Sequence, residues 1–166
     1  MQDFRPAAPN TPRVFAFLTN AVNTLLLLLA AAAPLLPTKD VTKTDTNKAP
    51  SAWTYWLRSG LGVSIAVILA ESGKHFVIWP GRPTFPSGHE TLALAAGTCL
   101  VLRHPRGLAL VLPLTVFQAW ALVAGHFHQP VDVAGALITG IGPPLGCHLL
   151  FPNLFLLHHQ NADEQA

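Results

Sequence analysis

The sequence predicts an all-α protein, built as a polytopic bundle of about five transmembrane helices. Of its 166 residues, 51% are apolar and only 11% are charged, a composition too apolar for an ordinary soluble domain. Apolar stretches long enough to cross a membrane recur along the chain, so a lipid bilayer is the expected environment. The 10 Lys and Arg residues form no block of like charge, and we therefore expect no nucleic-acid surface.

We expect a single membrane domain over residues 1–166, with spans at about 14–36, 53–78, 88–102, 108–124 and 130–150. The first span has about the 20 residues needed to cross the hydrocarbon layer. A cleaved signal peptide is the alternative, but this apolar stretch is longer than a usual signal core, and its end lacks the small residues of a cleavage site. A polar, aperiodic segment at 38–51 predicts a solvated loop before the second span.

The remaining spans are bounded by aromatic, capping and turn residues. Trp53, Tyr55 and Trp56 resemble an interfacial aromatic belt at the start of the second span. The third span opens at Gly88, and a tight turn over residues 103–107 leads into the fourth. Pro130 opens the fifth, because proline suits the first turn of a helix.

The distribution of basic residues predicts the orientation. One face of the bundle carries Lys39, Lys43, Lys48, Arg58, Arg103 and Arg106. The opposite face carries Arg5, Arg13, Lys74 and Arg82. Positively charged residues favour the cytoplasmic side. We therefore expect an integral protein of a bacterial inner (cytoplasmic) membrane, with the second face, and the candidate site on it, outside the cytoplasm.

The segment Pro86-Ser87-Gly88-His89-Glu90 has the pattern of a capped helix start. Ser87 is a suitable N-cap, and Glu90 three residues later completes a capping box. The first amides of such a helix bind anions, and Gly88 permits a close approach of the backbone. His89 at the rim can donate a proton to a leaving alkoxide. The alternative is a structural helix start whose histidine only lies at the interface.

Two basic residues precede this segment. Arg82 stands before Pro83 and presents a planar guanidinium that can hold two phosphate oxygens. Lys74 lies one helical stretch earlier and can contribute a second positive charge. Taken alone, Lys74 is equally explained as an interfacial lysine or as a partner of Glu71 three residues before it.

The segment from Gly125 to Asp132 contributes the third element. Asp132, on the opening turn of the last span, can reach back to His128 and hold one imidazole nitrogen, so that the other acts as a nucleophile. A purely structural His128–Asp132 pair is the alternative. A zinc site made of His126, His128 and Asp132 is a further alternative, but nearby Arg82 and Lys74 would repel a cation.

Together these motifs resemble the type 2 phosphatidic acid phosphatase family, the membrane branch of a superfamily with the vanadium haloperoxidases. The resemblance covers residues 74–142 and is most specific at the Pro-Ser-Gly-His segment. It implies that His128 forms a phosphohistidine, that His89 protonates the leaving group and that Asp132 orients His128. It also implies a phosphate site without metal or other cofactor, formed by Lys74, Arg82, Ser87 and Gly88.

Three departures from the family pattern stand out. The family has Ser-Arg where this chain has Ala121-Leu122, and the loss of one phosphate contact predicts a rate lower by about a hundredfold or more. We expect His126 to substitute for it in part. Lys74 leaves seven residues before Arg82-Pro83, whereas the family usually has six. Members of the family commonly have six spans, so a helix is absent or comes from a partner.

Two functions follow from this sequence. The first is a phosphatase that acts on a lipid phosphate or diphosphate held in the bilayer, since ionisable residues at a membrane edge are usually functional. The second is a catalytically inactive descendant that serves as a scaffold or subunit of a larger membrane complex. Small residues on the last span allow packing against a second copy or another membrane subunit in either case.

Overall fold

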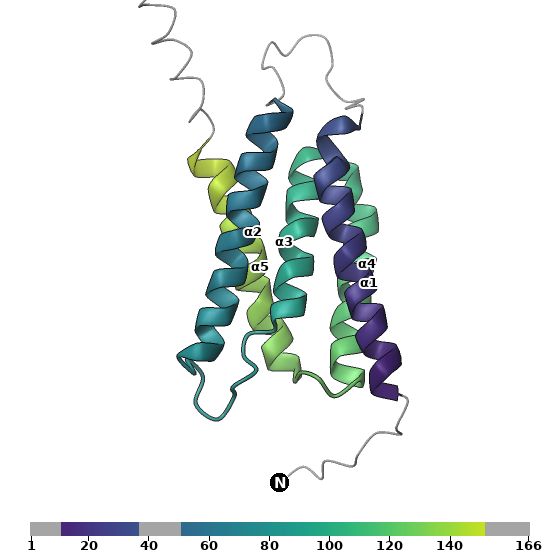
Figure 1. The fold of residues 1–166 in the computed structure, drawn as a ribbon, viewed down its shortest axis with the longest axis vertical. Helices are drawn as coiled ribbons and strands as arrows, with labels where there is room; N and C mark the ends of the chain where they lie inside the picture. Colours follow the sequence, from purple (N-terminus) through teal and green to yellow (C-terminus); the bar gives the residue numbers. More distant parts are fainter. Residues whose placement is uncertain (1–10, 37–50, 152–166) are drawn as a thin grey trace, which may run out of the picture.

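The computed structural model describes residues 11–36 and 51–151 and shows an all-helical bundle there, without strands in these ranges (Figure 1). The elements, in chain order, are α1 (Thr11–Ala32), η1 (Ala33–Leu35), α2 (Ala52–His75), α3 (Gly88–Arg103), η2 (Pro105–Gly107), α4 (Leu108–Ala124) and α5 (Pro130–Leu150). The predicted all-α fold is confirmed. The polar loop expected at 38–51 lies outside the described residues, except for Ser51.

In the described ranges, four of the five α-helices belong to apolar helical segments long enough to cross a membrane, and the segments of α1 and α4 include the adjoining 3-10 turns. These segments are Arg13–Leu35, Ala52–His75, Pro105–Ala124 and Pro130–Leu150. The remaining helix, α3, has only 16 residues, fewer than the roughly 20 that a full span needs. The structure therefore identifies an integral membrane protein of four to five spans.

The short helix α3 lies at the centre of the bundle and packs against all four other helices. Small residues on α3, among them Ala93, Ala95 and Ala96, are fully buried, and such residues let helices approach closely within a membrane. Helices α3 and α5 approach closely at Gly140, where an added Cβ would lie 2.7 Å from Cβ of Leu94. The helix that begins at the candidate site thus contacts each of the other four α-helices.

Helix α2 ends three residues earlier than the sequence predicts. Val77 has a left-handed backbone with φ 47°, which an α-helix cannot continue. The amide of Ile78 donates to the Gly73 carbonyl at 3.1 Å, and the amide of Val77 donates to the Lys74 carbonyl at 3.2 Å. This pattern is a Schellman motif. It turns the chain away from the helix axis directly after Lys74, so that residues 76–87 form a loop at the end of the bundle.

The two ends of the bundle differ in what they hold. Loops 76–87 and 125–129 lie together at one end, while η2 and the start of α2 lie at the other (Figure 1). At the second end, the 3-10 turn η1 follows α1. Backbone carbonyls there that have no partner within the helix accept hydrogen bonds from side chains. The Tyr55 hydroxyl donates to the Ala30 carbonyl at 2.9 Å, and Nε2 of His104 lies 2.7 Å from the Ala33 carbonyl oxygen.

Helix α1 contributes to the core of the bundle. It packs against α3 and α4, and Leu26 is fully buried. Its Asn23 is also buried, and Oδ1 accepts a hydrogen bond of 3.1 Å from Nε2 of Gln118 on α4. This hydrogen bond joins α1 to α4 inside the apolar bundle.

Candidate active site

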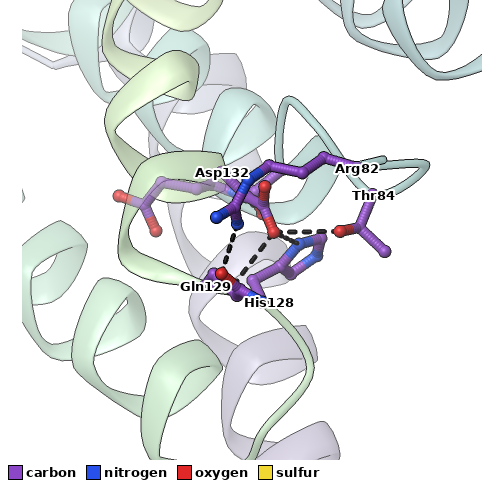
Figure 2. Close-up of polar contacts among 7 residues, drawn as sticks. Arg82, Thr84, His128, Gln129 and Asp132 are labelled. Atoms are coloured by element: carbon purple, nitrogen blue, oxygen red, sulfur yellow. Dashed lines mark hydrogen bonds and ion pairs between the residues drawn. The ribbon is translucent and has the colours of Figure 1, made fainter. Parts of the chain in front are cut away.

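Asp132 is the residue around which the candidate site is organised (Figure 2). Its side chain is 1% exposed. Its Oδ2 atom accepts hydrogen bonds from the Thr84 hydroxyl at 2.9 Å and from the Gln129 amide at 3.0 Å. Its carbonyl accepts from the Ser87 amide at 2.9 Å. Asp132 thereby joins the loop before α3 to the first turn of α5, two segments that are almost 50 residues apart in the sequence.

His128 lies beside this carboxylate, as the sequence predicts. Its Nδ1 atom is 3.6 Å from Oδ2 of Asp132, a distance that suits an ion pair but exceeds a hydrogen bond. Among the described residues, Nδ1 has no hydrogen-bond partner. The backbone is fixed by a 3.2 Å bond from the His128 amide to the carbonyl of Leu122. Because Nδ1 faces Asp132, Nε2 is the nitrogen available for chemistry.

Burial and neighbouring charges act on His128 in opposite directions. Burial lowers the pKa of His128, because an apolar environment disfavours the imidazolium. Asp132 opposes this effect, whereas the nearby positive charges of Lys74 and His89 lower the pKa of His128 further. A histidine with a lowered pKa is neutral at physiological pH, and the neutral ring is the nucleophilic form. The same interactions place Lys74 and His89 within electrostatic range of His128.

Arg82 reaches the same region from the loop before α3. One guanidinium nitrogen, Nη1, donates to Oε1 of Gln129, the residue that follows His128 (Figure 2). Gln129 is the position just before Pro130, which opens α5. The contact holds the guanidinium beside His128 and leaves its other N–H groups for a ligand, since guanidinium has five donors. The structure thus brings Arg82 and His128 together.

Lys74 lies over the first residue of α3. Its Nζ atom is 2.6 Å from Oε1 of Glu71, the partner considered from the sequence. A Cβ added to Gly88 would lie only 2.8 Å from Nζ of Lys74 and 2.9 Å from Oε1 of Glu71. The ammonium group is therefore next to the amides that open α3, where a helix terminus favours an anion. Only glycine leaves room for this arrangement.

His89 follows Gly88 and is exposed at the rim. Lys74 and Glu71 are both close enough to interact electrostatically with its ring. Its carbonyl accepts a 2.8 Å hydrogen bond from Nε2 of Gln118, the same atom that donates to Asn23. Gln118 was not among the residues expected at the site. It lies inside an apolar span, where a glutamine is expected to be hydrogen-bonded to other polar groups. Its position in that span is the sequence signal that could have identified it.

Ser87 and His126 are placed differently from the other predicted residues. Ser87 is fully buried, and its hydroxyl oxygen accepts from the Glu90 amide at 3.4 Å, so it serves as the helix cap. His126 is exposed beyond the end of α4, at Ala124, and has a left-handed backbone with φ 59°. His126 therefore does not continue the helical face of Leu122, which was the basis for expecting it to replace an arginine.

The positions that depart from the family pattern lie in the core. Ala121 and Leu122 are 0% and 1% exposed, so apolar packing occupies the place of the expected cation. Within the described ranges, no three His, Cys, Asp or Glu side chains come together as metal ligands. The zinc set considered from the sequence, His126 with His128 and Asp132, is thus not assembled.

Besides Gln118, two residues of the site were missed by the sequence analysis. Thr84 binds Asp132 across 48 positions of the chain, and no local pattern predicts that contact. Gln129 could have been found, because a residue before an N1 proline is the expected N-cap. Comparison of the chain with protein-family models, curated proteins and solved structures found no match.

Proposed function

We propose that this protein is a membrane phosphatase that hydrolyses a lipid phosphate or diphosphate through a phosphohistidine, as its resemblance to the type 2 phosphatidic acid phosphatases implies. One observation carries the proposal. The ammonium of Lys74 lies against Gly88 at the positive end of α3, and both His89 and His128 are within electrostatic range of it. Such a set of groups suits a phosphoryl group.

In the first step, Nε2 of His128 attacks phosphorus and the bond from phosphorus to the lipid oxygen breaks. His89, in its protonated form, gives its proton to the departing oxygen. The leaving group is the lipid alcohol, or the lipid monophosphate when the substrate is a diphosphate. Asp132 holds the ring of His128 by Nδ1 and stabilises the positive charge that develops on it. Lys74, Arg82 and the first amides of α3 stabilise the phosphoryl oxygens.

In the second step, a water molecule attacks the phosphorus of the phosphohistidine. His89, now neutral, accepts a proton from this water, and the bond from phosphorus to Nε2 breaks. Inorganic phosphate leaves, and both histidines return to their starting protonation states. Every proton and bond is accounted for by the two imidazoles, the lipid and water.

A catalytically inactive scaffold is the second candidate, and one observation favours it. Leu122 is almost fully buried at the position where the family pattern has an arginine. A scaffold or subunit would keep the packing of the bundle without needing that cation. The two candidates predict different results in a single assay.

The deciding experiment measures release of inorganic phosphate from a panel of lipid phosphates and diphosphates by the purified protein in detergent. We expect release without added metal. His128→Ala should reduce it more than a thousandfold, because no other group replaces the nucleophile. His148→Ala, a histidine in the last turn of α5, is the matched control. No release by folded wild-type protein, together with copurifying membrane subunits, would favour the scaffold.

We further propose that the protein lies in a bacterial inner membrane with its site on the extracytoplasmic side, as the distribution of Lys and Arg favours. Pro80 is exposed in the site loop and Pro105 is exposed in η2 at the opposite end. A membrane-impermeant maleimide should label Pro80→Cys in intact cells and leave Pro105→Cys unlabelled. The reverse pattern would place the site in the cytoplasm.

A further inference from the structure

An apolar cavity lies between α3, α4 and α5 and runs along much of the length of α3. Its volume is about 550 Å³, within the range of roughly 300–1,000 Å³ typical of ligand sites. Leu94, Val111, Leu137 and Ile141 are among its walls. It reaches from Glu90 to Leu102, a distance of about 18 Å at the usual helical rise.

The cavity opens sideways to the surroundings of the bundle. Leu112 and Val116 on α4 line it and are 56% and 59% exposed. In a membrane protein, this surface faces lipid chains. At its other end the cavity reaches Pro130 and Glu90, which directly follow Gln129 and His89 of the candidate site. The cavity thus borders two residues that directly follow residues of the candidate site in the sequence.

Glu90 is the polar exception in this cavity. It is 2% exposed, and its Oε2 atom has no hydrogen-bond partner among the described residues. The capping box expected from the sequence would have used this carboxyl to bind the Ser87 amide. That amide instead donates to the Asp132 carbonyl, so the carboxyl of Glu90 is released from capping and lines the cavity.

We propose that this cavity holds the hydrocarbon chain of the substrate lipid and that Glu90 determines specificity by binding a hydrogen-bond donor close to the phosphate, such as a free hydroxyl. The inference rests on the proposed function and adds the substrate class to it. A buried carboxyl oxygen without a partner, such as Oε2 of Glu90, is costly. A ligand that supplies the missing donor removes that cost, whereas a lipid without the donor leaves it in place.

The positions of His89 and Glu90 explain how one lipid can contact both side chains. His89, the proposed proton donor, and Glu90 are neighbours on the first turn of α3, and consecutive helical residues point in directions about 100° apart. A lipid whose phosphate lies by His89 therefore has its first carbons beside Glu90 and its chain along α3. The donor group must lie within a few bonds of the phosphate.

The first test compares two single-chain substrates that differ in one atom: a 1-alkylglycerol 3-phosphate with a free 2-hydroxyl, and its 2-deoxy analogue. We expect the wild-type protein to hydrolyse the hydroxyl lipid about tenfold better in kcat/KM, the effect of one hydrogen bond. Glu90→Leu should make the two substrates equal, and Glu90→Gln should keep a preference. Equal rates in the wild type, or a preference that survives Glu90→Leu, would overturn the role of Glu90.

The second test does not depend on catalysis. A 1-alkylglycerol with a diazirine in its chain and no phosphate is bound to the full-length protein in nanodiscs and photolysed, and the labelled peptides are identified. We expect labels on the facing surfaces of α3, α4 and α5. Leu137→Trp, which fills the cavity, should reduce labelling severalfold, and Ile138→Trp, on the exposed side of α5, should not.

The two tests separate the two proposals. Cavity labelling without any phosphate release would leave the lipid site standing and end the phosphatase proposal. Phosphate release with labels spread evenly over all lipid-facing surfaces would keep the phosphatase and overturn the cavity as the chain site. The same even labelling is the result expected if bulk bilayer lipid alone occupies the cavity.

Discussion

The two sides of the candidate site are built very differently. On the α5 side, Asp132 is 1% exposed, and its oxygens accept three hydrogen bonds, from Thr84, Ser87 and Gln129. On the α2 side, Lys74 and Glu71 form one ion pair whose side chains are 27% and 60% exposed. The first side is fixed by the protein itself, and the second is held by a contact that a ligand can replace.

This difference matches what each side is proposed to do. A nucleophile must be oriented before the substrate arrives, because errors in its position raise the barrier directly. A phosphate-binding cation needs only to be close, and an exposed ion pair of this kind contributes little to stability. Lys74 can exchange the carboxylate of Glu71 for a phosphoryl oxygen at low cost. Disruption of the fixed side should therefore be more damaging than disruption of the exchangeable side.

The largest effect is expected from Asp132→Asn. The amide would place an N–H group where an oxygen now accepts from Thr84 and Gln129, and it would no longer stabilise the charge on His128. We expect kcat/KM for phosphate release to fall about a hundredfold or more, with a lower Tm. Thr84→Val, which removes one of the three bonds, is the milder control and should cost severalfold. An unchanged rate in Asp132→Asn would remove Asp132 from the mechanism.

Lys74→Met tests the exchangeable side. We expect a fall of about tenfold in kcat/KM from the loss of one charge-assisted phosphate contact, with Tm almost unchanged because the lost ion pair is exposed. Arg106→Met, at the opposite end of the bundle in η2, is the charge-matched control. A fall in Tm as large as that of Asp132→Asn would show that both sides are equally structural.

Gly88→Ala should have a smaller effect on the same side. The new methyl group would lie 2.8 Å from Nζ of Lys74 and 2.9 Å from Oε1 of Glu71, so this flexible pair must move away from the first amides of α3. We expect KM to rise severalfold with little change in kcat. Gly142→Ala on α5 is the control, because its Cβ would meet no described atom within 4 Å. If both variants behave alike, the space at Gly88 has no part in phosphate binding.

The smallest effect is a shift of the pH profile. Burial lowers the pKa of His128, so its neutral, nucleophilic form persists below the usual titration range near 6.5, and the acidic limb of kcat/KM should lie below that range. Lys74→Met removes a positive charge that lowers this pKa further, and the limb should move to higher pH. A shift to lower pH would show that the charge of Lys74 does not lower the pKa of His128.

The fold was predictable from the sequence to within a few residues because α2, α3 and α5 begin at local start signals. Ser51 and Ser87 cap α2 and α3, and Pro130 opens α5. The early end of α2 was not predicted, since it depends on a left-handed Val77, and β-branched residues rarely take that conformation. Short-range chemistry sets most boundaries, and exceptions arise where a residue adopts a disfavoured backbone.

The candidate site was predictable as a set of residues but not as a network. The sequence singled out His128 and Asp132 from their spacing, and the structure places them together. It also predicted that Glu90 would complete a capping box, which requires that the Ser87 amide be free. The carbonyl of Asp132, 45 residues further along the chain, takes that amide instead. Competition between local and distant partners is decided by the tertiary fold.

The sideways opening between α4 and α5 has a kinetic consequence. A lipid that slides into the cavity through this opening never passes through water, so the encounter is a diffusion within the plane of the membrane. The rate of turnover should then follow the mole fraction of the lipid in the vesicle, and dilution of the whole vesicle suspension should leave it unchanged. The proposed phosphatase would therefore respond to the composition of the bilayer in which it lies.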